Sequence, residues 1–85
     1  MFIIKFTDWE ERTLPQRTKE AILKHVEYAK KRGDKDFDVV EAYDLKMQCY
    51  GEIRLAQYDV GLSDQEVATL FEKYVDLRVL LQEKH

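Results

Sequence analysis

The chain has 85 residues and a single cysteine, with 45% hydrophobic and 36% charged residues. This length corresponds to one domain spanning residues 1–85, and the hydrophobic share is too high for an intrinsically disordered chain. The apolar run at residues 2–4 is too short for a signal peptide or a membrane span. For this reason we expect no membrane partner. Because the lone Cys49 cannot form an internal disulfide, we also expect a cytoplasmic protein.

The formal net charge of −3 is unevenly distributed along the chain. Residues 12–35 contain eight basic and three acidic side chains, whereas residues 36–85 contain five basic and eleven acidic ones. One basic segment therefore lies within an otherwise acidic chain, and this asymmetry bears on the choice of partner more than the total does.

The N-terminal third is expected to form a strand, a connector and a helix. Residues 2–6 are β-branched and aromatic, which favours a short strand or an extended arm. Residues 7–13 are polar apart from Trp9 and are interpreted as a connector. Thr13 with Gln16 forms a capping-box pattern around Pro15, so the first helix is expected to begin there and to end at Gly33.

The middle of the chain, residues 36–60, allows two interpretations. As a hairpin, Gly51 would be the turn between two alternating strands. As a helix, Asp38 and Glu41 form a capping box, and one face collects small and apolar side chains: Ala42, Leu45, Cys49, Ile53, Ala56 and Val60. We favour the helix because its opposite face is cleanly polar over more residues, although Gly51 costs it about 1 kcal/mol.

The last helix begins at a Ser63 cap with Glu66 three residues on. Its apolar stripe contains Val67, Leu70, Phe71, Tyr74, Leu77 and Leu81. Residues 61–71 resemble the start of the helix-turn-helix in LuxR-type response-regulator output domains, where a Gly-Leu-Ser opens the supporting helix. That family continues with a turn and a recognition helix, whereas residues 72–77 continue the helix with no turn signal, so no DNA-binding function is carried over.

These elements predict a mainly α fold, a compact three-helix domain with a short N-terminal strand or extended arm. The alternative is an α+β domain in the order strand, helix, hairpin, helix. In the helical interpretation the N-terminal strand has no partner within the chain, so it is expected to pair across a homodimer.

Residue types suited to catalysis are few. His25 is the only internal histidine and falls on the apolar face of the first helix, and Cys49 also falls on an apolar face. We interpret both as structural, because no base, orienting group and nucleophile are visible together. One cysteine and one internal histidine do not make a closed zinc site, so no enzyme activity, metal or cofactor is expected.

The remaining signal is a surplus of large amphipathic side chains. Tyrosine, tryptophan and methionine are enriched at the centres of protein interfaces. We therefore predict a small non-catalytic protein-binding module, such as an inhibitor, adaptor or regulator of the kind that phages encode against host proteins. The expected anchors are Trp9, Tyr43, Met47, Tyr50 and Tyr58.

The alternative prediction is a small nucleic-acid-binding regulator that uses the basic face of the first helix. Basic side chains recur along that face and become more frequent toward the end of the helix, and a row of this kind can neutralise phosphates. The candidates are Arg17, Lys24, Lys30, Lys31, Arg32 and Lys35. Nucleic acid is the less favoured partner, because Glu20 and Glu27 share that face and the sequence pI is 5.4.

Overall fold

The computed structural model describes residues 5–76, and in that range the protein consists of helices with no strand. The elements are α1 (Asp8–Thr13), α2 (Gln16–Ala29), α3 (Val39–Val60), α4 (Asp64–Leu70) and one π-helical turn, η1 (Phe71–Val75). The predicted mainly α class is confirmed, with one more helix than the three expected.

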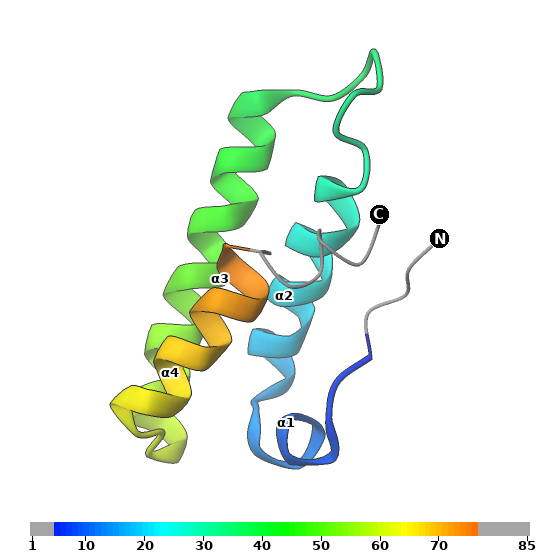
Figure 1. Cartoon of the computed structure of the whole chain (residues 1–85). Helices are drawn as coiled ribbons and strands as arrows, with labels where there is room; N and C mark the ends of the chain where they lie inside the picture. Colours follow the sequence, from blue (N-terminus) through cyan, green and yellow to red (C-terminus); the bar gives the residue numbers. More distant parts are fainter. Residues whose placement is uncertain (1–4, 77–85) are drawn as a thin grey trace.

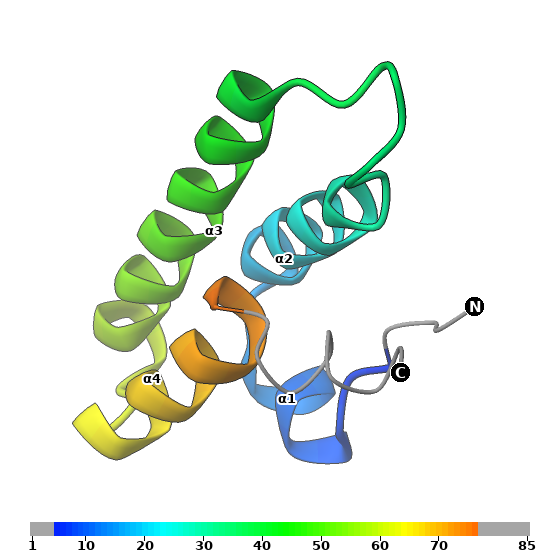
Figure 2. The ribbon, with the colours of Figure 1, turned by 45° about the horizontal axis from the view of Figure 1, so that its top comes forward.

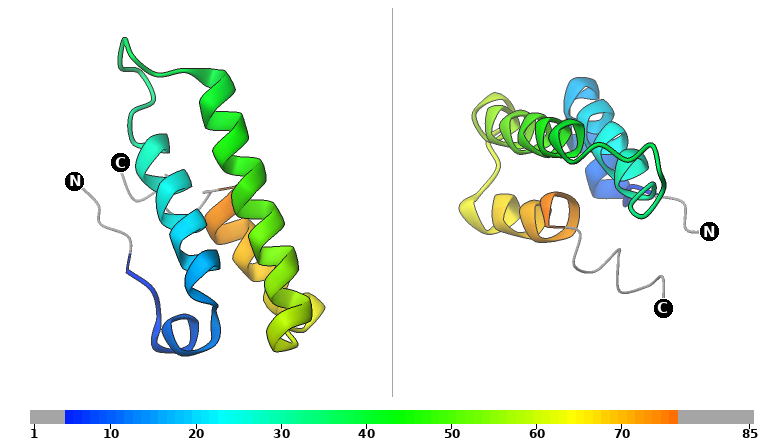
Figure 3. Two further views of the ribbon diagram at one scale, coloured as in Figure 1. Left: turned by 180° about the vertical axis from the view of Figure 1, so that it is seen from behind. Right: turned by 90° about the horizontal axis from the view of Figure 1, so that it is seen from above.

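Helices α2 and α3 lie side by side and run in opposite directions, joined at one end by residues 30–38 (Figure 1). From the far end of α3 the chain turns into α4 and η1, which run back across the lower half of α3 (Figures 1 and 3). The short α1 lies at the lower end of α2, close to η1 (Figure 2). Among the described residues, α2 and the connecting loop lie beside the upper end of α3, and the end of η1 reaches its middle, where the Cys49 thiol lies 4.0 Å from the carbonyl oxygen of Tyr74.

The helical interpretation of residues 38–60 is confirmed, and the hairpin is wrong. The Asp38 carboxylate accepts hydrogen bonds from the backbone N–H groups of Val40 (2.9 Å) and Glu41 (3.5 Å) and so caps the first turn. The N–H of Asp38 donates to the Tyr28 hydroxyl at 2.8 Å, which ties the start of α3 to α2. Gly61 ends the helix at φ +74°, a left-handed conformation that glycine adopts without steric cost.

The expectation of a connector at residues 7–13 is wrong, because residues 8–13 form α1. Thr7 caps this helix: the Glu10 N–H donates to the Thr7 hydroxyl (3.2 Å), and the Thr7 N–H donates to the Glu10 carboxylate (2.9 Å). These reciprocal bonds satisfy two N–H groups that would otherwise lack partners, which stabilises a helix of only six residues.

The predicted boundaries of the first long helix are also corrected. Thr13 does not cap it, since Thr13 is the last residue of α1 and α2 starts after Pro15 with no side-chain cap. The helix ends at Ala29, four residues before Gly33, because the chain there tightens into turns in which the Lys31 N–H donates to the carbonyl of Tyr28. Gly33 does adopt the expected positive φ, at +99°, within that turn.

The predicted start of the last helix is confirmed. Ser63 and Glu66 form the predicted capping box. Beyond Leu70 the helix widens: the Asp76 N–H donates to the carbonyl of Phe71, five residues earlier, at 2.8 Å. Leu77 and Leu81 of the predicted stripe, and most of the predicted strand at residues 2–6, lie outside the described residues. Of that strand, Lys5 and Phe6 are described and have no regular secondary structure.

The core lies where α2, α3 and the α4–η1 segment meet. Its largest fully buried side chains are Tyr74, Ile22, Ile53, Leu70 and Val26. The Phe6 ring packs edge-on against Tyr74, with ring centroids 5.8 Å apart. The Thr18 hydroxyl donates to the carbonyl of Glu52 at 3.3 Å, a polar link between α2 and α3 at the edge of this core.

Candidate functional site

Exposed large hydrophobic side chains are confined to α3 in the part of the chain that the structure describes. They are Val39, Val40, Tyr43, Met47, Leu55, Tyr58 and Val60. Single exposed hydrophobic residues are normal on protein surfaces, but a gathering on one element is not. The concentration on α3 marks this helix as the candidate site.

Four residues of this set, Val40, Tyr43, Met47 and Tyr58, follow one side of α3 at intervals of three or four once the exposed Gly51 and Arg54 between them are included. We call the residues Val40, Tyr43, Met47, Gly51, Arg54 and Tyr58 the α3 stripe. Side chains three and four positions apart lie above one another on a helix, so the stripe follows one side of α3 for about 27 Å. Tyr43 is 62% exposed and Tyr58 is 78% exposed, so both ends of the stripe present an aromatic ring to solvent.

The other predicted anchors lie partly inside the protein. Tyr50 is half-buried and stacks on Phe71 of η1, with ring centroids 4.7 Å apart. Trp9 is half-buried and packs against the core from α1. Among the five predicted interface residues, the structure therefore brings Tyr43, Met47 and Tyr58 together on the exposed side of α3, whereas Trp9 and Tyr50 contribute to packing.

A cavity of about 580 Å³ opens between the upper ends of α2 and α3, beside the top of the stripe. Tyr43 belongs to both features. The walls of the cavity are mainly apolar and include Ala29 and Phe37, with Arg32 and Lys46 as basic members and Asp76 as an acidic one. A cavity of this size and lining can receive an apolar side chain, with charged side chains of both signs in its walls.

His25 lies in the wall of this cavity and is buried, as the sequence predicts for a structural histidine. Its Nε2 lies 3.3 Å from the carbonyl oxygen of Val75, a contact in which the Nε2–H tautomer acts as the donor. Burial lowers the pKa of His25 and the nearby Lys46 charge adds to this, while the bond to Val75 opposes both. The ring therefore joins α2 to η1 in its neutral form.

Glu10 is the polar residue that the sequence interpretation missed. It is 4% exposed, and its Oε1 accepts a hydrogen bond from the Tyr74 hydroxyl at 2.6 Å, while its Oε2 lies 3.1 Å from the Lys73 ammonium. Burial alone would raise the pKa of Glu10, but the hydrogen bonds from Tyr74, Thr7 and Lys73 outweigh burial and lower it. The Thr7-x-x-Glu10 spacing is the signal that could have revealed the cap, although not the contact with η1.

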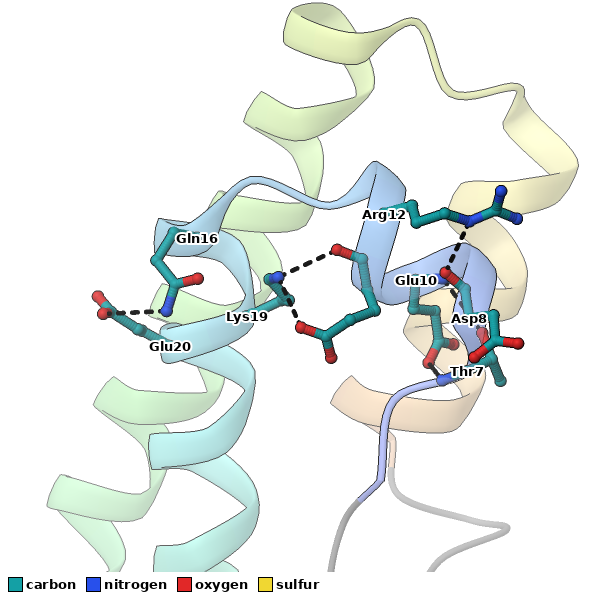
Figure 4. Close-up of polar contacts among 8 residues, drawn as sticks. Thr7, Asp8, Glu10, Arg12, Gln16, Lys19 and Glu20 are labelled. Carbon is teal, nitrogen blue, oxygen red and sulfur yellow. Dashed lines mark hydrogen bonds and ion pairs between the residues drawn. The ribbon is translucent and has the colours of Figure 1, made fainter.

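Figure 4 shows how α1 is held against its neighbours. The Lys19 ammonium of α2 reaches the carbonyl and the carboxylate of Glu11, at 3.1 and 3.0 Å. The Thr7–Glu10 pair lies at the start of the same helix (Figure 4). This polar cluster ties α1 to the lower end of α2, and its exposed members Asp8, Glu11 and Arg12 line a shallow surface depression.

Cys49 is fully buried, as expected for a core residue. Burial raises the pKa of its thiol to about 12, which keeps it protonated and unreactive at neutral pH. Residues 5–76 contain no group of three or more histidine, cysteine, aspartate or glutamate side chains placed to hold a metal ion.

The basic residues of the alternative prediction do not form an uninterrupted positive surface. Arg17 pairs with Glu52 of α3 (3.0 Å), and Lys30 pairs with Glu27 (3.0 Å). Lys24 and Lys31 share a shallow depression with Glu27 and Glu41. Arg32 and Lys35 are exposed in the turn after α2. Acidic side chains are thus interleaved with the basic ones along α2 and its neighbour.

None of the helices between residues 5 and 76 combines the length and the apolar character needed to cross a lipid bilayer. Searches of protein-family models, curated protein sequences and solved structures find no match to this chain.

Proposed function

We propose that this protein is a small, non-catalytic protein-binding domain that acts as an inhibitor, adaptor or regulator through the exposed side of α3. One observation carries the proposal: every exposed large hydrophobic side chain among residues 5–76 belongs to that helix. Transfer of these apolar side chains from water into contact with a partner lowers the free energy.

The composition of the stripe supports a protein as partner. Tyrosine places a large ring in an interface at low cost in side-chain entropy, and its hydroxyl tolerates water when the partner is absent. Methionine adapts its shape to an irregular partner surface. Tyr43, Met47 and Tyr58 combine these properties along one helix, which suits packing against a partner's groove or helix.

The stripe is presented by a rigid element. Asp38 and Gly61 cap the two ends of α3, and its inner side chains Cys49 and Ile53 are fully buried. A preformed surface loses little conformational entropy when it binds, so the apolar area it buries contributes more fully to affinity.

The test is capture of a partner from a lysate of the source cells by the tagged protein. The double variant Tyr43→Ser/Tyr58→Ser should lose a discrete protein that the wild type retains after nuclease treatment and in high salt. The matched control is Glu41→Ser/Asp59→Ser, which alters the same helix at exposed polar positions and should retain the partner. Far-UV circular dichroism checks that both variants stay helical.

Equal retention by the two double variants would contradict the use of the α3 stripe. Recovery of nucleic acid alone, lost after nuclease or in high salt, would replace the proposal with binding through the basic side chains of α2.

A further inference from the structure

We propose that the α3 stripe takes a second copy of this chain, with the two α3 helices packed antiparallel and crossing at Gly51. This inference rests on the proposed function, because it names the partner of the same surface. Three features of the stripe carry it: a glycine that the protomer does not need, spacings that match about that glycine, and the position of a single charge.

Gly51 lies near the middle of the 22-residue helix α3 and is exposed. Its backbone conformation does not require glycine, since the positive φ values among the described residues belong to Gly33 and Gly61. A Cβ atom added at Gly51 would meet no atom of residues 5–76 within 4 Å, so packing among these residues does not require glycine either. Because glycine destabilises a helix interior relative to alanine, its remaining physical use here is to let another backbone approach closely.

Residues of the stripe lie at nearly equal distances before and after Gly51, so they would face each other if two α3 helices packed antiparallel. Met47 precedes it by four positions and Arg54 follows by three, while Tyr43 precedes it by eight and Tyr58 follows by seven. An antiparallel pair with its two-fold axis near Gly51 therefore sets Tyr43 of one copy against Tyr58 of the other. In a two-fold interface each such contact occurs twice, which makes the surface self-complementary.

The charge of Arg54 selects the antiparallel direction over the parallel one. Arg54 is the only charged residue of the stripe. Parallel helices would place the two Arg54 side chains opposite each other, and like charges in contact repel. In the antiparallel pair, Arg54 lies against Met47 of the second copy, within one helical turn of its Asp44. The arginine stem can then cover methionine while the guanidinium reaches a carboxylate.

The exposed area of the stripe's side chains is consistent with a weak dimer. Large aromatic side chains carry about 150–250 Å² each, so the exposed fractions of Val40, Tyr43, Met47 and Tyr58 amount to roughly 500 Å² per copy. Complete burial of these side chains in both copies would bury at most about 1,000 Å² in total, the lower limit for a specific interface. Such a dimer is expected to dissociate on dilution rather than persist as an obligate assembly.

Sedimentation equilibrium over a range of protein concentrations tests the dimer. The wild type should shift from monomer to dimer mass as concentration rises. Gly51→Gln places a bulky side chain at the crossing point, and it should weaken association by about tenfold or more while leaving the melting temperature of the dilute monomer unchanged or higher. The matched control Glu41→Gln, on the polar side of α3, should associate like the wild type.

Disulfide trapping tests the direction. In a Cys49→Ala background, a mixture of Tyr43→Cys and Tyr58→Cys proteins should form a crosslinked dimer on mild oxidation, and Tyr43→Cys alone should not. A wild type that stays monomeric, association unaffected by Gly51→Gln, or efficient crosslinking of Tyr43→Cys alone would each overturn the proposal. If the wild type is monomeric yet the tyrosine double variant loses a captured protein, the second copy is excluded while the protein-binding function stands.

Discussion

The contact between α1 and η1 and the exposed side of α3 reverse the usual partition of residues between interior and solvent. At the first, the carboxylate of Glu10 is 4% exposed and receives hydrogen bonds from Tyr74, Lys73 and the Thr7 backbone. At the second, the ring of Tyr58 is 78% exposed. A charged group is buried because neighbours satisfy it, and an aromatic group stays exposed because no described neighbour covers it.

This difference separates a surface used for folding from one available for binding. Polar groups at the α1–η1 contact are paired internally, and residues 5–76 contain no buried side-chain nitrogen or oxygen without a hydrogen-bond partner. Changes there should alter the free energy of unfolding. Changes on the α3 stripe should alter association while stability is kept. The predictions below test that separation, from the largest expected effect to the smallest.

The strongest contrast lies within α3 itself, between two residues on opposite sides of the helix. Ile53 is 0% exposed and Leu55 is 51% exposed. Ile53→Ala should reduce the free energy of unfolding by about 3 kcal/mol, because it removes buried methyl groups and leaves a cavity. Leu55→Ala should change it by less than about 0.5 kcal/mol. Urea unfolding followed by circular dichroism measures both, and similar losses would show that the two sides of α3 are not distinct.

Glu10→Ala tests the α1–η1 contact. The variant loses the Thr7 capping box and leaves the buried Tyr74 hydroxyl without its carboxylate partner, so we expect a loss of about 2–3 kcal/mol in the free energy of unfolding. The matched control is Glu72→Ala, an exposed glutamate in η1, which should cost less than about 0.5 kcal/mol. A similar small cost for Glu10→Ala would mean that α1 does not stabilise the fold.

The smallest effect is on pH dependence, through His25. Its pKa in the folded protein lies below the ordinary value of 6.5, so the unfolded chain binds more protons as the solution is acidified. The stability that neutral His25 provides is therefore complete above pH 6.5 and is lost as pH falls toward the lowered pKa. Glu10 acts in the same direction below its ordinary value of 4.5.

Urea midpoints measured between pH 7 and pH 4.5 check this prediction. The wild-type midpoint should fall across that window, and His25→Gln should flatten the upper part of the decline, since glutamine does not titrate. An identical slope in the variant would assign the decline to other groups.

Several local features could be predicted from the residues alone because short-range physics determines them. Ser63 with Glu66 caps α4, and Asp38 caps α3, as their spacing indicates. The periodicity of the predicted apolar face identified the buried side of α3 only in its middle: Cys49, Ile53 and Ala56 are buried, Ala42 and Leu45 are partly exposed, and Val60 is 43% exposed. The same reasoning placed a cap at Thr13 and missed the one at Thr7, because a six-residue helix is too short to show a hydrophobic period.

The candidate site could not be predicted from residue type and periodicity alone. Tyr43, Tyr50, Tyr58 and Trp9 are equally suited to a core or to an interface by residue type, and only the position of η1 against the lower half of α3 separated Tyr50, stacked on Phe71, from the two exposed tyrosines. The burial of Glu10 likewise required Tyr74 and Lys73, more than sixty residues away in the chain, to arrive beside it.

The sequence by itself favoured the helical class and determined two of the helix starts, at the Asp38 and Ser63 caps, together with the middle of the inner side of α3, because hydrogen-bond capping and helical periodicity act over a few residues. Tertiary structure alone decided which aromatic side chains remain exposed and which carboxylate is buried. Those outcomes depend on contacts between distant segments, and a segment's own residues do not specify what will cover it.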